Sequence, residues 1–344
     1  MPRKFKIAVT ACPINCVRLE INDLALVAIK YNGGTWFTPF IGGRLGGLST
    51  LARPMNLLVE PEDVFSFAKA TVEIYRDYGP RRSKGTARFA HMVQEWGVDR
   101  IRQKIEEYLG KTFKRFDTSS LKLDWRDHVG VNEQKQEGLY YVLLPLLAGK
   151  INVYRFKKLI TFAEKHGYEL RTSLLQKLIV ANILKEKLEE FRTMLRQINL
   201  DPSSPHLRWS SLACPGGMCG KAVEALKEKI WEIEQHLEKT LGRCLDDLRI
   251  RIAINGCSNS CAHHKIAEIS LQMTVVRANE GIKPAYDLFI RGTSSKISQK
   301  VLTGVPSEEI KYVLKRVIKS YLESGFRYSE EFGERLIRGE IKWS

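Results

Sequence analysis

The chain has 344 residues, which at roughly 150 residues per domain suggests two or three folded domains. Apolar residues make up 44% of the chain and charged residues 27%, and these ordinary values exclude a globally disordered or a fibrous protein. Lysine and arginine together number 55 against 39 aspartates and glutamates, and the formal net charge of +16 favours an anionic partner: nucleic acid, an acidic protein or an oxyanion ligand. Charge alone does not choose among them.

No run of apolar residues is long enough to cross a bilayer. The longest, from Leu139 to Ala148, is about half of the ~20 residues that a membrane span needs. The apolar stretch that follows the basic N-terminus, from Ile7 to Ala11, is too short for a secretory signal. We therefore expect no membrane span and a cytoplasmic location.

The chain contains an internal repeat. Residues 4–16 (KFKIAVTACPINC) align without gaps with residues 249–261 (RIRIAINGCSNSC), so that both cysteines of each pair coincide. In both copies the apolar residues that follow alternate in a way that predicts a strand. Two copies of one α/β module are therefore expected.

The match between the copies continues further along the chain. Residues 40–43 (FIGG) correspond to residues 289–292 (FIRG). Pro61 and Pro306 each precede acidic residues and begin a predicted helix, because proline and carboxylates suit a helix's first turn. The second copy is preceded by a long helical stretch over residues 221–241, whereas the first begins almost at Met1 and lacks this front end.

Between the copies, the pattern predicts a compact βαβα domain with linkers on both sides. The predicted strands and helices, in chain order, are residues 139–147, 153–166, 178–181 and 185–197. The linkers are residues 112–127 and 201–205. The expected domains are residues 1–112, 113–200 and 201–344.

Six of the seven cysteines occur in close pairs, which indicates thiolate ligands rather than disulfides in a chain without an export signal. Cys214-x4-Cys219 and Cys257-x3-Cys261 can together surround one metal centre. A structural zinc ion is one reading. A [4Fe-4S] cluster is the other, favoured by glycine-rich loops whose backbone N–H groups can approach the cluster's sulfurs.

The motifs resemble those of the siroheme-dependent nitrite and sulfite reductase family. Residues 213–220 (ACPGGMCG) and 255–261 (NGCSNSC) resemble its two cluster-binding motifs, and residues 2–6 (PRKFK) are similar to the segment before its first-copy strand. Residues 129–138 (VGVNEQKQEG) and 170–176 (LRTSLLQ) resemble its second ferredoxin-like half-domain. The resemblance covers essentially the whole chain and the C-terminal two thirds or so of a typical member.

The resemblance implies an α+β fold in which a ferredoxin-like half-domain lies between two siroheme/4Fe-4S-type α/β domains, the first of them truncated. It also implies a six-electron reduction of sulfite or nitrite at a siroheme whose iron shares a cysteine thiolate with the cluster. By position, Cys261 is the expected bridging ligand, and Cys214, Cys219 and Cys257 hold the other irons.

The resemblance also assigns residues to the substrate and the macrocycle. Lys4 and Lys6 match the family's substrate-binding, proton-donating lysines, and a lysine at the second position is more similar to sulfite than to nitrite reductases, so sulfite is the expected substrate. The remaining candidates are expected to contact the cofactor: Arg44, Arg81, Arg82, Arg171, Gln176 and Asn259. Arg81 and Arg82 suit a solvated loop equally well.

The sequence departs from the family pattern in three places. The first cysteine pair is one residue shorter than usual, the first half-domain is missing, and the first copy carries Cys12 and Cys16, which suit a buried vestige of duplication better than a second metal site. A second polypeptide that supplies the missing half, or a gene start placed too late, would explain the second departure.

These departures leave two functions open: a siroheme reductase, or a [4Fe-4S] electron-transfer or assembly subunit without productive siroheme. The basic surface suits an acidic ferredoxin or a reductase subunit as electron donor. Nucleic acid is not expected, because the chain has no basic stripe interleaved with aromatic residues and no helix-turn-helix pattern.

Overall fold

The computed structural model describes residues 1–11, 14–121, 128–200, 202, 206–245, 248, 250–278, 281–293, 295–326 and 329–341. The chain forms two compact units, Met1–Asp127 and His128–Ser344, here called unit 1 and unit 2. Cys12 lies outside the described residues.

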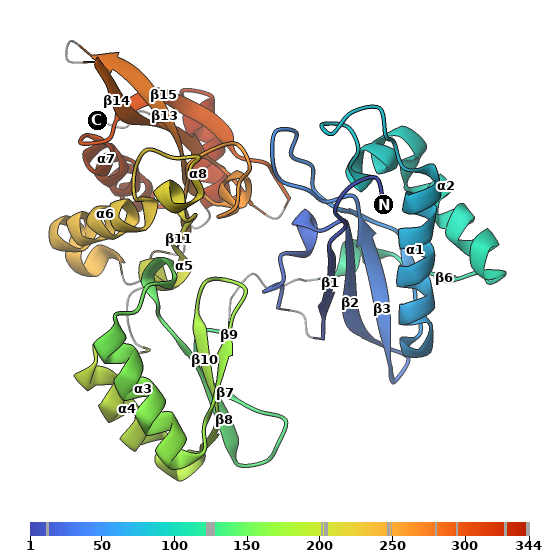
Figure 1. Cartoon of the computed structure of the whole chain (residues 1–344), viewed down its shortest axis with the longest axis horizontal. Helices are drawn as coiled ribbons and strands as arrows, with labels where there is room; N and C mark the ends of the chain where they lie inside the picture. The colour runs from blue at the N-terminus through green and yellow to red at the C-terminus, as the bar shows by residue number, and fades with distance from the viewer. Residues whose placement is uncertain are drawn as a thin grey trace. The chain divides into compact units, whose positions relative to one another are not determined.

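Unit 1 contains a four-stranded sheet in the order β1-β2-β3-β4, with β1 and β2 parallel and the other pairs antiparallel (Figure 1). A separate ladder pairs β5 with β6. The elements of unit 1 are β1 (Ile7–Thr10), β2 (Leu24–Tyr31), β3 (Gly34–Ile41), β4 (Arg53–Pro54), β5 (Leu57–Leu58), α1 (Val64–Tyr78), α2 (Phe89–Leu109) and β6 (Lys114–Arg115).

The strand β2 is buried on both faces, which explains its almost continuous apolar sequence. Leu24 and Leu26 pack with the buried side chains of α1 and α2, whereas Ala25 and Val27 belong to a second, smaller cluster. The helices therefore cover one face of the sheet, and the loops that lead to the candidate site lie at the end of the strands where β2 begins.

Unit 2 begins with an antiparallel sheet in the order β7-β8-β10-β9 that packs against two helices. Its elements are β7 (Gly130–Glu133), β8 (Leu139–Leu144), α3 (Val153–His166), β9 (Glu169–Thr172), β10 (Leu178–Leu184) and α4 (Leu188–Gln197). The helix α3 begins at the N-cap Asn152, whose side chain accepts a hydrogen bond from the backbone of Arg155, and ends at the left-handed Gly167. This part therefore folds as ββαββα.

The rest of unit 2 is a five-stranded sheet in the order β11-β12-β13-β14-β15, in which the first three strands are parallel and the last two are antiparallel (Figure 1). Its elements are α5 (His206–Ser210), β11 (Leu212–Ala213), α6 (Leu226–Leu241), β12 (Ile252–Asn255), β13 (Ile269–Ala278), β14 (Gly281–Ile290), β15 (Gln299–Pro306), α7 (Ile310–Glu323) and α8 (Ser329–Ile337). The apolar sides of α6 and α7 belong to the core of this sheet.

The structure confirms the duplication. The strands β1 and β12 occupy aligned positions of the two copies, and each lies parallel to the strand that follows it, β2 or β13, which then pairs with an antiparallel partner. Arg18 and His263, which are aligned in the repeat, both have left-handed backbones. Gly43 and Gly292 are also equivalent, because a Cβ atom at either position would lie 2.4 or 2.3 Å from a backbone oxygen, that of Glu20 or Ala267.

A carboxylate occupies the same place in both copies. In the second copy, Glu268 accepts the backbone N–H of Arg251 at 2.9 Å and the guanidinium of the same residue at 2.8 Å. In the first copy, Asp23 accepts the backbone N–H of Lys6 at 3.0 Å, but its guanidinium comes from Arg88. The carboxylate at this position is therefore neutralised by a different arginine in each copy.

The sequence did not predict the strands β7 and β9 of unit 2, and it placed the start of α6 too early. The short strand β9 has a single half-buried apolar side chain, that of Leu170, so no alternation reveals it. The predicted helix over residues 221–241 begins instead at Leu226, because the preceding segment packs on the first cysteine loop, where the N–H of Gly217 donates to the carbonyl oxygen of Glu224 at 3.0 Å.

The predicted domain limits at residues 112 and 200 stay predictions. Phe113 belongs to the core of unit 1, and β6 pairs with β5 there, so the chain stays with unit 1 beyond residue 112. Residues 122–127 of the predicted linker, and residues 201 and 203–205, lie outside the described residues.

Candidate functional site

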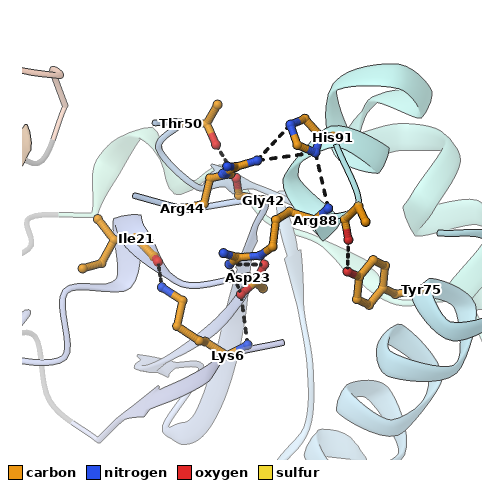
Figure 2. Close-up of polar contacts among 10 residues, drawn as sticks. Lys6, Ile21, Asp23, Gly42, Arg44, Thr50, Tyr75, Arg88 and His91 are labelled. Atoms are coloured by element: carbon orange, nitrogen blue, oxygen red, sulfur yellow. Dashed lines mark hydrogen bonds and ion pairs between the residues drawn. The ribbon is translucent and has the colours of Figure 1, made fainter. Parts of the chain in front are cut away.

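A buried ion pair joins the start of β2 to the start of α2 in unit 1 (Figure 2). The side chain of Asp23 is completely buried, and its carboxylate oxygens lie 2.9 and 3.0 Å from Nη2 of Arg88, a residue only 4% exposed. Because Arg88 is the N-cap residue of α2, the pair fixes the first turn of this helix to the sheet.

Lys6 and Lys4 precede β1, and Lys6 lies beside this ion pair. The Nζ atom of Lys6 donates to the carbonyl oxygen of Ile21 (Figure 2). Burial lowers the pKa of Lys6 to about 8, the carboxylate of Asp23 opposes this shift, and the charges of Arg88 and the exposed Lys4 add to it. Lys6 can therefore give up a proton near neutral pH.

Arg44 lies on the turn that follows β3. Its backbone exchanges two hydrogen bonds with Thr50, at 2.8 and 2.9 Å. The preceding Gly42 has a φ of +84°, and a Cβ atom there would lie 2.9 Å from Cγ1 of Val93 in α2. Only glycine therefore lets this turn approach α2 so closely.

His91, in the first turn of α2, contacts both arginines (Figure 2). Its Nε2 atom lies 2.8 Å from Nη1 of Arg44, and its Nδ1 atom lies 3.3 Å from the backbone nitrogen of Arg88. Burial and then the guanidinium of Arg44 lower the pKa of His91, so the ring is neutral at pH 7.

Positive charge exceeds negative charge in this cluster. Burial and then the charge of Arg88 lower the pKa of both Lys6 and Arg44, the charge of Arg3 also lowers the pKa of Arg44, and the carboxylate of Asp23 opposes both shifts. We call these five residues, Arg3, Lys6, Asp23, Arg44 and Arg88, the cationic cluster. Within the described parts of the chain, the buried Nε atoms of Arg44 and Arg88 have no hydrogen-bond partner. A buried N–H group without an acceptor is costly, so the cluster fits an anion that supplies oxygen atoms, such as a carboxylate or a small oxyanion.

Arg81 and Arg82 lie on the loop between α1 and α2. The guanidinium of Arg81 donates to the carbonyl oxygens of Gly79, at 3.0 Å, and Arg76, so it caps the C-terminal end of α1. Arg82 is exposed and makes no hydrogen bond or ion pair with the described residues. Their assignment to the cofactor stays a prediction, and Arg81 already has a structural role.

The two cysteine loops of unit 2 leave the same edge of the sheet. Cys214 directly follows β11, Cys257 follows β12 after one residue, and these strands are parallel neighbours. The backbone N–H of Cys214 donates to the carbonyl oxygen of Ile254 at 3.0 Å, and the N–H of Gly256 points to Sγ of Cys214 at 3.2 Å. A backbone donor aimed at a thiolate is what a cluster ligand requires.

Glycine is needed for this meeting of the loops. A Cβ atom on Gly256 would lie 2.5 Å from Cβ of Ala222, and one on the left-handed Gly216 would lie 2.8 Å from the carbonyl oxygen of Glu224. The close approach leaves Cys214 buried. Cys219 and Cys261 are exposed, and Cys257 is half-buried.

The four cysteines are not gathered around one point. Over the described ranges, which include all four, no group of three or more histidine, cysteine, aspartate or glutamate side chains is placed to hold a metal ion. The donor chemistry of the two loops fits an iron–sulfur cluster, and the ligand set Cys214, Cys219, Cys257 and Cys261 stays a prediction.

Gln176 contacts the residue before the first cysteine loop. Its Nε2 atom donates to the carbonyl oxygen of Ala213 at 2.8 Å, and its Oε1 atom accepts the N–H of the same residue at 3.3 Å. Arg171 is exposed and paired with Glu169 at 2.5 Å, and Asn259 is exposed on the second cysteine loop. Gln176 therefore holds the cysteine loop, while the predicted cofactor contacts of all three residues stay untested.

Asp23, Arg88 and His91 were not predicted from the sequence as site residues. Asp23 aligns with Glu268, an acid at the start of a buried strand in both copies, and this was the available signal. Arg88 and His91 lie beyond Gly79, where the sequence match between the two copies ends, so the repeat could not reveal them.

Family models and curated relatives match this chain. Residues 1–113 match the model described as the nitrite and sulphite reductase 4Fe-4S domain, and residues 132–198 match the nitrite/sulfite reductase ferredoxin-like half domain. The ferredoxin–nitrite reductase of Leptolyngbya laminosa is 30% identical over 92% of this chain and 63% of its own length. The sulfite reductase [NADPH] hemoprotein beta-component of Bacillus subtilis is 27% identical over 99% of this chain and 61% of its own length.

A solved structure, that of the Mycobacterium tuberculosis NirA protein, matches with a TM-score of 0.89 at 26% identity and covers 98% of this chain and 63% of its own. The chain thus spans less than two thirds of the length of these relatives. Among the described residues, no helix has the length and apolar character of a membrane span. With its duplicated modules, its intervening half-domain and these matches, the chain belongs to the family of nitrite and sulfite reductases that carry siroheme and a [4Fe-4S] cluster.

Proposed function

We propose that this chain takes part in the six-electron reduction of sulfite to sulfide, or of nitrite to ammonia. The cationic cluster is the observation that carries this proposal, because among the described residues the buried Nε–H groups of Arg44 and Arg88 have no acceptor, and an anion would supply one. The cluster's charge suits both a small oxyanion and the carboxylates of a siroheme.

In this proposal, the chain's own residues bind anions and supply protons. Arg44 and Arg88 donate N–H groups to anionic oxygen, and Lys6 gives a proton as an oxygen atom of the substrate leaves as water. Its pKa of about 8 keeps it mostly protonated at pH 7 yet able to release a proton. The exposed Lys4, whose charge adds to the lowering of the pKa of Lys6, would be a second proton donor.

The cysteines hold the redox centre. Cys214, Cys219, Cys257 and Cys261 would hold the cluster, and the thiolate of Cys261 would also hold the siroheme. When bound, the two groups supply the electrons, and backbone N–H groups such as that of Gly256 tune the cluster. The donor would be an acidic protein such as a ferredoxin, because the chain carries a net charge of +16. A cytoplasmic location stays a prediction.

The first test is the composition of the full chain, purified without oxygen from cells supplied with siroheme. An absorption spectrum with siroheme bands and about five irons per chain supports the reductase. About four irons without a macrocycle supports the alternative, a [4Fe-4S] electron-transfer or assembly subunit, and no iron contradicts both. Turnover of sulfite and of nitrite with a chemical reductant then identifies the preferred substrate.

Lys6 makes a second test possible. Because its folded pKa is about 8, turnover that depends on its proton is expected to fall as the pH rises through about 8. Lys6→Gln should lower turnover about a hundredfold and remove this limb of the pH profile, since general acid catalysis contributes on this scale. An unchanged limb in the variant would exclude Lys6 as the proton donor.

A further inference from the structure

His91 is not used by the function proposed above. It lies in the first turn of α2 and approaches Arg44, with Nε2 2.8 Å and Nδ1 3.4 Å from Nη1 of that residue (Figure 2). Since a guanidinium can only donate, the ring must accept, and Nε2 is the nearer acceptor.

Both residues of this contact are fixed by further hydrogen bonds. The backbone of Arg44 is fixed by its two hydrogen bonds to Thr50, and the hydroxyl of Thr50 donates to the carbonyl oxygen of Gly42 at 2.9 Å. The ring of His91 is fixed by a hydrogen bond with the backbone of Thr86. The contact therefore joins two rigid elements and sets the direction of one guanidinium plane.

Only one N–H group of Arg44 is used by His91. Its Nε atom is buried and has no acceptor among the described residues. A guanidinium has five N–H groups in a fixed planar fork, so a bond at Nη1 determines where the others point. The guanidinium of Arg44 is therefore oriented by His91, and its Nε–H group is still available to an acceptor.

We infer that His91 is a positioning residue, whose neutral imidazole orients Arg44 so that the unused N–H groups of the guanidinium bind an anionic oxygen ligand. The inference rests on the proposed function. The ligand's chemistry, a carboxylate of the macrocycle or an oxygen of the substrate, is the same for Arg44, and the experiment separates the two sources.

Protonation of His91 would break this arrangement. The ring would lose its acceptor, and the charged groups that face it, Arg44, Arg88 and Arg3, are all positive; its other neighbour is the backbone of Thr86. The lowered pKa of His91 means that the neutral form is favoured in the folded state, so the arrangement is complete above about pH 6.5 and is lost as the pH falls through the lower folded value.

The experiment compares His91→Gln and His91→Phe in the full chain, with His236→Gln in unit 2 as the matched control. Nitrite and sulfite affinities are titrated by absorption between pH 5 and pH 8, and siroheme content is measured separately. His91→Phe should weaken the anion contact about tenfold, the scale of a hydrogen bond to a charged group. His91→Gln, whose amide oxygen can accept from Arg44 but does not titrate, should restore binding and remove the loss at low pH.

The two readouts distinguish the two ligands. A loss of siroheme content in His91→Phe assigns Arg44 to the macrocycle, and a loss of nitrite or sulfite affinity at full siroheme content assigns it to the substrate. Unchanged content and affinity in His91→Phe, or a low-pH loss that persists in His91→Gln, would overturn the inference.

An NMR titration of the histidines tests the contact without any cofactor. Arg44→Gln and Arg44→Lys should both be made, because the uncharged variant removes the repulsion and the lysine keeps it. The pKa of His91 should rise in Arg44→Gln, and that of His236 should not change in either variant. An unmoved pKa of His91 overturns the positioning contact even if siroheme binds, whereas a failure of the wild-type chain to bind siroheme contradicts only the proposed function.

Discussion

The buried ion pair between Asp23 and Arg88 is expected to carry a large share of the stability of unit 1. Asp23→Asn keeps the shape of the side chain and leaves an oxygen for the backbone N–H of Lys6. It removes the charge opposite Arg88, whose guanidinium then stays buried and unneutralised. Breaking a buried ion pair in this way costs about 3–5 kcal/mol, against a typical total of about 5–15 kcal/mol for a domain.

The geometry supports the upper part of this range. Neither side chain has more than 4% of its surface exposed, and both carboxylate oxygens bind one Nη2 atom, at 2.9 and 3.0 Å. Because Arg88 also begins α2, the released guanidinium would disturb the first turn of that helix. By contrast, the exposed ion pair of Lys104 and Glu107, 2.9 Å long in the same helix, should contribute little to stability.

Native-state hydrogen exchange is the suitable assay, because a chain of two units does not unfold in one step. The free energy of opening is read from amides in β2 and α2, and amides in β13 of unit 2 serve as the internal reference. Asp23→Asn should lower the first by several kcal/mol and leave the second unchanged. Glu107→Gln is the matched control.

A double variant separates the charge from the packing. Asp23→Leu with Arg88→Met replaces the pair by apolar side chains of similar volume, and such replacements are often neutral. It should recover most of the stability that Asp23→Asn loses. A loss below about 1 kcal/mol for Asp23→Asn, or a double variant as unstable as the single one, would refute the reasoning.

Three further predictions concern unit 2. Gly256→Ala forces its Cβ atom to within 2.5 Å of Cβ of Ala222, so the cysteine loops must separate and the iron content should fall by more than half, measured by iron and labile-sulfide assay, while the far-ultraviolet circular dichroism stays the same. Gln176→Leu removes two hydrogen bonds to the backbone of Ala213 and should cost about 1–3 kcal/mol, read by hydrogen exchange in β11 and β12; wild-type protection there would contradict the role. Burial raises the pKa of Glu234 to about 8, so its contribution to stability is present at low pH and is lost as the pH rises through about 8; Glu234→Gln should flatten this dependence in urea unfolding at a series of pH values, and an unchanged slope would assign it to another group.

The parts of the fold that repeat, or that alternate over a long stretch, could be predicted from the sequence. The strands β1 and β12 were evident because two aligned segments share both their apolar pattern and their cysteine spacing. The helix α3 was predicted with its observed bounds, since an N-cap asparagine and a following glycine mark its ends. The strand β9 and the helix α2 were not predicted, because β9 is too short to alternate and α2 is divided by a kink at Gly97.

The candidate site was only half predictable for a different reason. Lys6 and Arg44 stand next to motifs that can be read locally. The site also contains Asp23, Arg88 and His91, which come together only because the start of α2 contacts the start of β2. This contact spans 65 residues of the chain, and no local sequence pattern predicts it. Arg81 shows the reverse case, since a basic residue in a suitable loop proved to bond the carbonyl oxygens at the end of α1.

The carboxylate that both copies carry at the same place, Asp23 or Glu268, bears on how the two copies diverged. In the second half, Arg251 donates both its backbone N–H and its guanidinium to Glu268, and it also donates to the carbonyl oxygen of Ile266. The side chain of Arg251 therefore holds the strands together. In the first half, Arg88 neutralises the carboxylate of Asp23, and Lys6, the residue equivalent to Arg251, contacts this carboxylate only through its backbone N–H. The guanidinium of Arg88 thus released the side chain of Lys6 from the carboxylate alone: its ammonium keeps the bond to the carbonyl oxygen of Ile21, the equivalent of Ile266, and natural selection could adapt it to chemistry while Arg251 continued to neutralise Glu268.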